Sequence, residues 1–537
     1  MRSECLPFSQ IPHSTPLFTD FLSFQPKVRQ FYPRSAFFLE WLKDEAAAVS
    51  YDSQRRERVA TILERQNRTW GSSAAVTKNI ERLRAGAHAV VTGQQVGLFG
   101  GPVFSIYKAL TAVKLADLAT QSGLGCVPVF WLATEDHDLA EVNHISIPDS
   151  EGLQRVIAAT QGLPDAPVGT ITFGSEIEAV LASAVGLLGD TPVAGALRKS
   201  YRPGETFGSS FARLFARLFA DWGVILLDAS DPELHGIAEP IYRAAVEGAA
   251  ELDEALLARG RELEVAGYHQ QVKVTPSSSL LFALRDGARV PVHRRGNGST
   301  GQFVIEKEEI SQKELLSRIA VSPQSFSPNV LLRPVVQDYL LPTLAYTGGS
   351  AEVAYFAQAA VVYAKLLGRI TPIVPRFSAT IVDSKLRGLL DRYQLTLQDL
   401  FHGPERLCEQ LAAHALPSEL QSSFDRANAS LQSSMAVIRD SLSRLDKTLV
   451  DAAQNAESKM RHQLESLRAR AARAELRQSE LLGRHAALLS NSLYPNKVLQ
   501  EREIAGIYFL SRYGTELLRD LYDSIHADCL DHQVISL

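Results

Sequence analysis

A strand, a glycine-rich loop, a helix and a second strand follow one another in the first third of the chain, and this order constrains the fold most. Residues 89–92 form an apolar run that predicts a short buried strand, and an apolar run over 127–133 predicts another. Between them, the glycine-rich loop leads into a helix expected over about 103–119. Because parallel strands need a long crossover, usually a helix, this order predicts a βαβ unit. We therefore expect an α/β fold built on a parallel sheet.

Polar residues follow both predicted strands. The segment Thr92–Gly101 comes after the first strand, and the acidic cluster Glu135–Asp138 comes after the second. In open parallel sheets, functional groups gather beyond the carboxyl ends of the strands. Both clusters fall at those ends, so the sequence predicts a ligand site at this edge of the sheet.

The loop after the first strand has the composition of an anion cradle. Its glycines let the backbone bend tightly and expose N–H groups, and the helix that follows adds partial positive charge at its N-terminus. The loop matches neither GxxxxGK followed by Ser or Thr nor GxGxxG, which excludes a P-loop or a dinucleotide fingerprint. Lys108, early in the helix, could reach a phosphate or could simply be solvated. The candidate ligand-binding residues here are Thr92, Gly93, Gln94, Gln95, Gly97, Gly100, Gly101 and Lys108.

Three carboxylates and an imidazole crowd the end of the second strand. Like charges so close raise one another's pKa, which favours general-base chemistry. The alternative is a helix cap, because Asp and Glu favour helix starts. His137, Asp138 and His144 are of types that bind metals, but their spacing matches no metal signature, so no metal site is predicted. The candidate catalytic residues are Glu135, Asp136, His137 and Asp138, and Asn143 and His144 are further candidates for ligand binding.

A third polar cluster lies much later in the chain. Arg333 is suited to holding a carboxylate with two parallel hydrogen bonds, and a structural salt bridge is the competing interpretation. A second glycine pair forms a permissive loop, and an acid follows just inside the next expected helix. The candidate binding residues are Arg333, Gln337, Asp338, Tyr339, Gly348, Gly349, Glu352 and Arg376.

Residues 418–490 carry a heptad pattern. Phe424, Leu431, Ile438, Leu445 and Ala452 recur every seven residues, with a companion row at Asn428, Met435, Leu442, Leu449 and Ala456. This seam predicts a long helical coiled coil, and an ordinary helix lying on the protein body is the alternative. A helix of that length finds too few surfaces within its own chain. A second copy of the protein is therefore its expected partner, which predicts a homodimer.

Length and composition fit a multidomain globular protein. The chain has 537 residues, and its net charge of -5 argues against a dedicated nucleic-acid binder. The four cysteines form no CxxC pair, so reduced thiols in a reducing compartment are expected. No apolar run reaches the roughly 18 residues that span a bilayer. We expect a cytoplasmic protein that binds neither nucleic acid nor membrane.

Five segments, taken together, resemble the bacillithiol-biosynthesis cysteine-adding family. They are TGQQVGLFGGPVFSIYKA, PVFWLATEDHDLAEVNH, RPVVQDYLLPTLAYTGGSAEVAYF, IVPRFSATIV and LYPNKVLQER, in this order from about residue 90 to 510. The resemblance implies a Rossmann-like core with connecting-peptide insertions and a coiled-coil dimerisation segment. It also implies a ligase that adds L-cysteine to glucosamine-malate in the last step of bacillithiol synthesis.

The expected organisation follows from these patterns and from the resemblance. It comprises an N-terminal helical part (1–85), a first half of the core (86–150), a core continuation with insertions (151–325), a second half of the core (326–415), the coiled coil (416–492) and a helical tail (493–537).

A looser similarity at fold level connects the chain to class I aminoacyl-tRNA synthetases, although HxGH and KMSKS motifs are absent. Activation of the cysteine carboxylate by ATP, with Mg²⁺ as the nucleotide counter-ion, is the expected chemistry. Two alternatives stay open. One is another Rossmann-type transferase that uses a nucleotide or a sugar, and the other is a non-catalytic coiled-coil scaffold.

Overall fold

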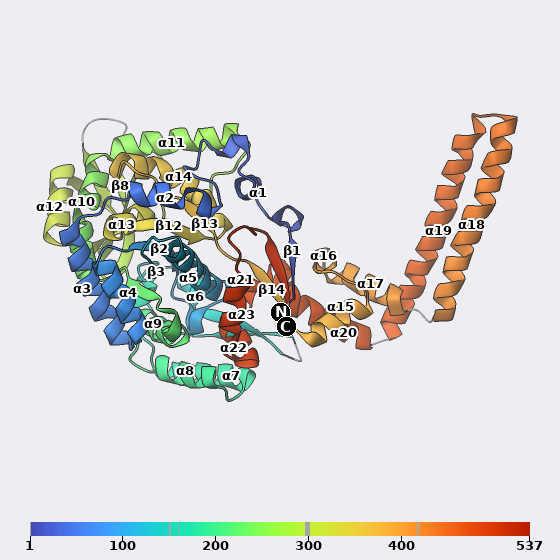
Figure 1. The fold of residues 1–537 in the computed structure, drawn as a ribbon, viewed down its shortest axis with the longest axis horizontal. Coiled ribbons are helices and arrows are strands. Elements are labelled where there is room, and N and C mark those ends of the chain that lie inside the picture. The colour runs from blue at the N-terminus through green and yellow to red at the C-terminus, as the bar shows by residue number, and fades with distance from the viewer. Residues whose placement is uncertain (1, 150–151, 161, 296–300, 416–417, 479) are drawn as a thin grey trace.

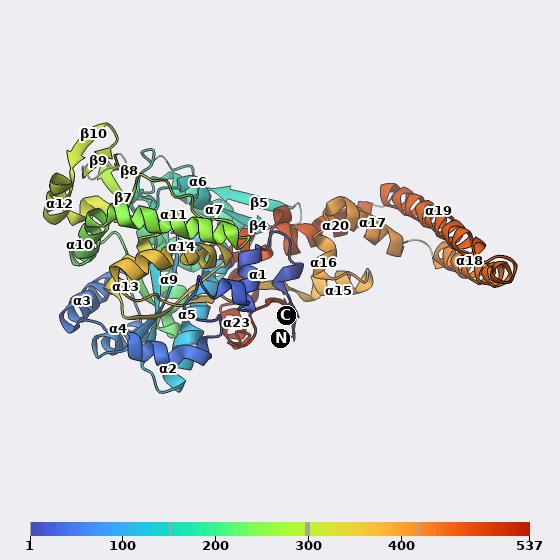
Figure 2. The same cartoon turned by 90° about the horizontal axis from the view of Figure 1, so that it is seen from above.

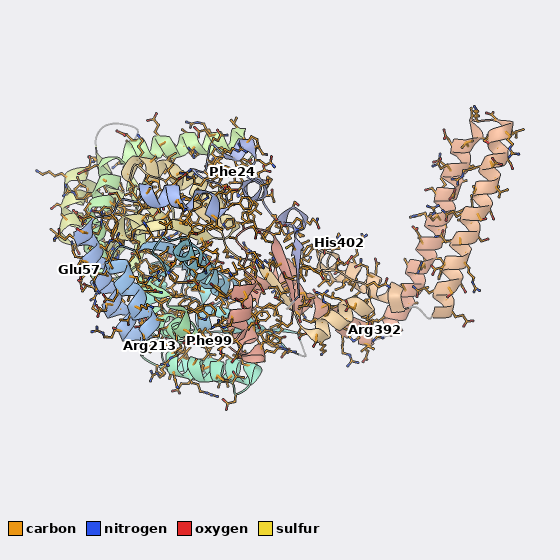
Figure 3. All side chains as sticks on the ribbon, in the orientation of Figure 1. Phe24, Glu57, Phe99, Arg213, Arg392 and His402 are labelled. Carbon is orange, nitrogen blue, oxygen red and sulfur yellow. The ribbon has the colours of Figure 1, made fainter. Side chains whose placement is uncertain are left out.

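A computed structural model describes the chain except residues 1, 150–151, 161, 296–300, 416–417 and 479. It consists of a large α/β body and a helical arm that extends away from it (Figure 1). Side chains fill the body densely, whereas many on the arm project outward from the two helices (Figure 3). Among the described residues, no helix is both long and apolar enough to cross a membrane.

Five parallel strands form the central sheet in the order β13, β12, β2, β3, β6. Their bounds are β2 His88–Gln94, β3 Cys126–Leu132, β6 Ile225–Asp228, β12 Thr343–Gly348 and β13 Ile373–Pro375. Helix α5 (Phe104–Gln121) connects β2 to β3, which confirms the predicted βαβ unit and the Rossmann-like fold class.

The sheet is buried on both faces, as its apolar strands require. Val129 and Trp131 of β3 join the core on one face, and Phe130 and Leu132 join the core on the other. Pro128 lies within this central strand although it has no N–H to donate. Proline is rare in central strands, but it is tolerated here because β6 pairs with β3 only from Val129 onward.

The helices of the body include α2 and α3, which lie in the N-terminal part that was expected to be helical. The helical bounds in the body are α1 Pro16–Leu22, α2 Phe38–Ala48, α3 Ser53–Trp70, α4 Ala74–Arg84, α6 Leu139–Val142, α7 Glu176–Leu188, α8 Pro192–Ser200, α9 Phe207–Leu218, α10 Pro232–Glu247, α11 Ala249–Val265, α12 Gln312–Val321, α13 Arg333–Leu340 and α14 Ser350–Leu366. After the sheet come α15 Ser384–Arg392, α16 Leu397–Leu400, α17 Pro404–Ala415, α20 Glu480–Leu493, α21 Gln500–Glu503, α22 Gly506–Tyr513 and α23 Leu517–Asp523.

Two antiparallel sheets lie apart from the central sheet. One pairs β4 (His144–Pro148) with β5 (Leu153–Ile157). The other has the order β10, β9, β8, β7, β11, with bounds β7 Ser278–Arg285, β8 Ala288–Arg294, β9 Gln302–Ile305, β10 Glu308–Ser311 and β11 Phe326–Pro328. Strands β7 and β8 form an antiparallel pair. The dipeptide Asn297-Gly298, a combination typical of tight turns, lies outside the described residues.

The two chain ends meet in one sheet, which was not expected, although helices make up most of the remaining structure in both terminal parts, as predicted. Strand β1 (Arg2–Leu6) pairs antiparallel with β15 (His532–Ser536), and β15 pairs parallel with β14 (Ala379–Val382). Each strand is only four or five residues long and obtains its partner from a distant part of the chain. Local periodicity carries no signal for such a pairing.

The arm is a hairpin of two helices, α18 (Ser418–Leu445) and α19 (Leu449–Gln478), which lie side by side in both views (Figures 1 and 2). The expectation of one uninterrupted helix through this region is therefore wrong. Asp446 stops it, because its Oδ1 atom accepts hydrogen bonds of 2.8 Å from both the backbone N–H and the hydroxyl of Thr448. The partner of α18 is α19 of the same chain, so the heptad seam does not by itself require a second copy.

The Sγ atoms of Cys5 and Cys529, two residues far apart in the chain, lie 3.1 Å from each other, and all four cysteines are free thiols. We predict that hydrogen peroxide joins them: an S–S bond forms, and both thiol hydrogens leave with two electrons to give water. Burial, followed by the contact with Cys5, raises the pKa of Cys529 to about 11, so the reaction should accelerate as pH rises toward that value. Non-reducing peptide mass mapping should find the disulfide between Cys5 and Cys529. Oxidation of Cys5 by peroxide without formation of this disulfide would contradict the prediction.

Candidate functional site

A cavity of about 470 Å³ opens at the carboxyl ends of β2, β3 and β12. This is the edge of the sheet at which the sequence placed a ligand site. Nine of the predicted residues line the cavity: Gly93, Gln94, Gln95, Lys108, Asp136, Arg333, Gly349, Glu352 and Arg376. They come from segments more than 200 residues apart, and the sheet brings them together.

A buried ion pair forms one part of the cavity wall. The ammonium of Lys108 lies 2.6 Å from a carboxylate oxygen of Glu352, and it also donates to the carbonyl of Gly93 at 2.7 Å and to Oε1 of Gln94 at 2.9 Å. Burial lowers the pKa of Lys108. Burial alone would raise the pKa of Glu352, but the charge of Lys108 and hydrogen bonds from Lys108, Tyr346 and the Gly349 N–H lower it overall.

This geometry corrects both interpretations of Lys108. The side chain is 6% exposed, so it is not solvated. All three of its N–H donors already have partners within the protein, which leaves none for a phosphate. Lys108 instead fixes the positions of Gln94 and Glu352 at the cavity.

Two further carboxylates line the cavity and are joined by one amide. Nε2 of Gln95 donates to Oδ2 of Asp136 at 2.9 Å and to Oε2 of Glu141 at 3.1 Å. The other oxygen of Asp136 accepts the backbone N–H of His137 at 2.7 Å. Asp136 is partly exposed and lines the cavity, so its carboxylate is accessible to a ligand and held in place by its neighbours.

The other three members of the acidic cluster point elsewhere. Glu135 turns toward a buried imidazole, with its Oε1 3.2 Å from Nε2 of His235. Asp138 accepts the N–H of Glu141 at 3.1 Å as the N-cap of α6, so the helix-cap interpretation holds for this residue. His137 lies outside the cavity lining, with Nδ1 3.3 Å from a guanidinium nitrogen of Arg289. The cluster therefore supplies one side chain to the cavity.

Arg333 faces the cavity from the start of α13. Its guanidinium donates to the hydroxyl of Tyr355 at 2.8 Å and to Oε1 of Gln337 at 3.2 Å, and it lies over the ring of Tyr346. In the described part of the chain, no carboxylate lies within 4 Å of it, so the salt-bridge interpretation has no partner here. Arg333 remains a cation held in place by neutral groups and available to an anion.

Several other predicted residues have structural contacts outside the cavity lining. Gln337 donates to Asp338, which also accepts the hydroxyl of Tyr363 at 2.6 Å. Tyr339 stacks under the guanidinium of Arg55. Thr92 donates to the carbonyl of Thr347. Asn143 and His144 contact each other at 3.3 Å. At Gly348, a Cβ would come within 2.7 Å of Glu352.

The glycines at the end of the loop also lie away from the cavity. Gly97, Gly100 and Gly101 are absent from its lining, and a Cβ on Gly100 would meet Phe215 and Leu214 at 3.3 and 3.4 Å. Gly100 and Gly101 have φ of 88° and 70°, which is the left-handed region that favours glycine. Their contribution is to the shape of the loop.

We therefore predict that Gly100→Val lowers stability. Positive φ and the close contact with Phe215 should together cost about 1–3 kcal/mol of unfolding free energy, or more. Urea denaturation measures this loss. Gly186→Val is the matched control, because Gly186 lies in α7 with open space around it. Equal stability of the two variants would contradict the structural role of Gly100.

The sequence missed several cavity residues. Glu141, Gln271, Tyr346 and Arg502 line the cavity from α6, an insertion, β12 and α21. Arg502 could have been predicted from the sequence, because it lies in the LYPNKVLQER segment of the family resemblance. Among the described residues, no group of three or more His, Cys, Asp or Glu side chains could hold a metal ion.

Comparison with known proteins identifies the family. Residues 1–377 match the N-terminal Rossmann-like domain of bacillithiol biosynthesis BshC, and residues 379–537 match its C-terminal coiled-coil domain. Proteins described as "Putative cysteine ligase BshC" are 49% identical in Koribacter versatilis and 39% identical in Solibacter usitatus, in both cases over 536 residues and 100% of both chains. The protein with that description in Salinibacter ruber is 32% identical over 99% of this chain and 100% of its own. The chain therefore belongs to the BshC family of bacillithiol biosynthesis.

Proposed function

We propose that the chain is a cysteine ligase that joins L-cysteine to glucosamine-malate in the last step of bacillithiol synthesis. The observation that carries this proposal is the mixed charge of the cavity lining. Asp136 and Glu141 contribute carboxylates and Arg333 contributes a guanidinium to a common space of about 470 Å³. A ligand with an amine at one end and a carboxylate at the other, such as glucosamine-malate, matches this arrangement.

Amide formation assigns one role to the acidic side chain of Asp136 and another to the basic side chain of Arg333. The sugar amine attacks the activated carboxyl carbon of cysteine, a C–N bond forms, and the C–O bond to the leaving group breaks. Asp136 accepts the proton that the amine loses, since it is the acid of the cluster that faces the cavity. Arg333 holds a carboxylate of the malyl group through charge-assisted hydrogen bonds.

ATP is the proposed source of activation, with Mg²⁺ as its counter-ion. A free carboxylate is a poor acylating agent, so its oxygen must leave on a phosphate or a nucleotide. Lys108 has no free donor for the phosphates, and the remaining cations at the cavity are Arg333, Arg376 and Arg502. We place the reaction in the cytoplasm, in keeping with the four free thiols.

Mass spectrometry of reaction mixtures tests the function. Purified protein with glucosamine-malate, cysteine and ATP should yield the cysteinyl amide, and omission of any one should abolish it. Product formed without cysteine, from a nucleotide sugar, would favour a transferase instead. An active protein after loss of the Asp136 and Arg333 side chains would show that the reaction takes place elsewhere.

We also propose that the arm joins two copies into a homodimer. Its two helices pack on each other yet leave apolar side chains in solvent, including Val437 at 67%, Leu445 at 78% and Leu467 at 54% exposure. Apolar surface of this kind, gathered on one projecting element, is typical of an interaction site.

Light scattering tests the dimer. Val437→Glu combined with Leu445→Glu should convert a dimer into a monomer, because charges would have to be buried at the interface. Val265→Glu is the control, since Val265 is 90% exposed on α11 of the body. A double variant with unchanged dimer mass, or a monomeric unmodified protein, would contradict the assignment.

A further inference from the structure

A second cavity of about 350 Å³ adjoins the first. The N-terminal segment 8–18 forms one side of it, and the segment 494–502 before and within α21 forms another. Gln271, Gly349, Ala351, Arg376 and Arg502 line both cavities. The proposed reaction uses only the first cavity, so the second has room for a further ligand or for a second part of the same ligand.

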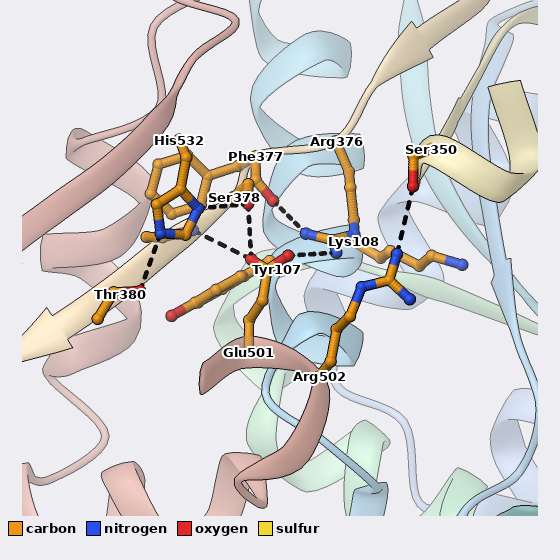
Figure 4. Close-up of polar contacts among 12 residues, drawn as sticks. Tyr107, Lys108, Ser350, Arg376, Phe377, Ser378, Thr380, Glu501, Arg502 and His532 are labelled. Carbon is orange, nitrogen blue, oxygen red and sulfur yellow. Dashed lines mark hydrogen bonds and ion pairs between the residues drawn. The ribbon is translucent and has the colours of Figure 1, made fainter. Parts of the chain in front are cut away.

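Two guanidinium groups stand where the cavities meet (Figure 4). Arg376 is held firmly, since it contacts Oε1 of Glu501 at 2.6 Å and donates to the carbonyl of Phe377 at 2.8 Å. Among the described residues, the guanidinium of Arg502 makes one hydrogen bond, of 3.3 Å, to the hydroxyl of Ser350. Arg502 is exposed, and it lines both cavities.

The acids nearest this junction are each paired with a cation other than Arg502. Glu501 is bound to Arg376, and Glu352 is bound to Lys108. Within the described residues, no carboxylate lies within 4 Å of Arg502. Desolvation, and then the positive charge of Arg376, lower the pKa of Arg502, while the charges of Glu501 and Glu352 act in the opposite direction. The two cations therefore destabilise each other. An anion between them would offset that repulsion.

A buried network behind Arg376 fixes its position (Figure 4). Ser378 donates to Oε2 of Glu501 at 2.9 Å, so its oxygen must accept from Nδ1 of His532, 2.7 Å away. Burial lowers the pKa of His532 to about 4, so the ring is neutral at pH 7, and its Nε2 accepts from Thr380 at 2.8 Å. In this row of hydrogen bonds, from Thr380 through His532 and Ser378, each donated hydrogen points toward Glu501. This arrangement keeps the Glu501 carboxylate ionised and Arg376 in place.

We propose that Arg376 and Arg502 form a binding subsite for an oxyanion, either a carboxylate or a phosphate, where the two cavities meet. Arg376 is the fixed member, positioned from the C-terminal strand through Ser378 and Glu501. Arg502 is the adaptable member, with donors free for the ligand. The subsite rests on the proposed function only for the choice of ligands, and it is measured by binding, so it can fail or succeed independently of turnover.

Calorimetric titration of the full-length protein tests the subsite with three separate probes: ATP, L-malate and inorganic phosphate. Arg502→Gln should weaken at least one of them by about tenfold or more, as expected when a charge-assisted hydrogen bond is lost. Arg502→Lys should retain most of the affinity. Arg484→Gln, which changes an exposed arginine of α20, should leave all three unchanged.

The pattern among the probes identifies the source of the oxyanion. If Arg502→Gln weakens the affinity for ATP and for phosphate, the subsite binds a nucleotide phosphate. If it weakens the affinity for L-malate alone, the subsite binds a substrate carboxylate. If it weakens the affinity for all three, the subsite binds oxyanions in general. Unchanged affinities in a folded Arg502→Gln protein would overturn the proposal. So would unmodified protein that binds none of the probes, whether or not it forms the cysteinyl amide.

Discussion

Replacement of Asp136 by Asn should lower turnover by about a hundredfold or more, the usual contribution of a positioned general base. Substrate binding should weaken much less, because proton transfer stabilises mainly the transition state. Asn keeps the size of the side chain and can still contact Gln95, so the fold should persist. Steady-state kinetics with cysteine, ATP and glucosamine-malate, together with a thermal melt, would measure both effects.

Asp138→Asn is the matched control, two residues away. Asp138 caps α6 and points away from the cavity lining, so its change should affect stability by about 1 kcal/mol or less and leave the rate nearly unchanged. His137→Ala should also retain much of the activity, since its ring contacts Arg289 instead of the cavity. If the His137→Ala variant lost activity and the Asp136→Asn variant kept it, the general base would be the imidazole of His137.

Lys108→Met should produce the largest loss of stability. It removes one partner of the buried pair with Glu352 and leaves a carboxylate without its cation, which typically costs about 3–5 kcal/mol. The reaction should fail as well, because Gln94 and Glu352 would lose their common partner at the cavity. Urea denaturation measures the unfolding free energy.

The double variant Lys108→Met with Glu352→Gln separates charge from packing. It removes both charges and keeps the side-chain volumes, so it should recover much of the lost stability. Single and double variants that are equally unstable would show that packing around Lys108, not the unpaired carboxylate, sets the loss.

The position of the site could be predicted from sequence because it follows from strand order. An apolar run that ends in polar residues defines the carboxyl edge of a parallel strand, and Gln95 and Asp136 both lie at the predicted edge. Which side chain of the acidic cluster faces the cavity could not be predicted. That depends on the turn after β3, where Asp138 caps α6 and Glu135 turns toward His235.

Features that depend on distant contacts were also beyond local patterns. The heptads of the arm continue through Leu445 and Ala452, and only the hydrogen bonds of Asp446 to Thr448 reveal the chain reversal between them. Lys108 resembles any exposed helical lysine until Glu352, more than 200 residues later, is brought beside it. Patterns of periodicity report which face is buried, not which partner covers it.

A crystal structure of the protein with glucosamine-malate bound would show whether the reaction takes place in this cavity. We predict that the ligand occupies the cavity at the carboxyl ends of β2, β3 and β12, with its amine within hydrogen-bond distance of Asp136 and a malyl carboxylate on Arg333. A ligand found outside this cavity, or bound in it with its amine turned away from Asp136, would show that Asp136 is not the base.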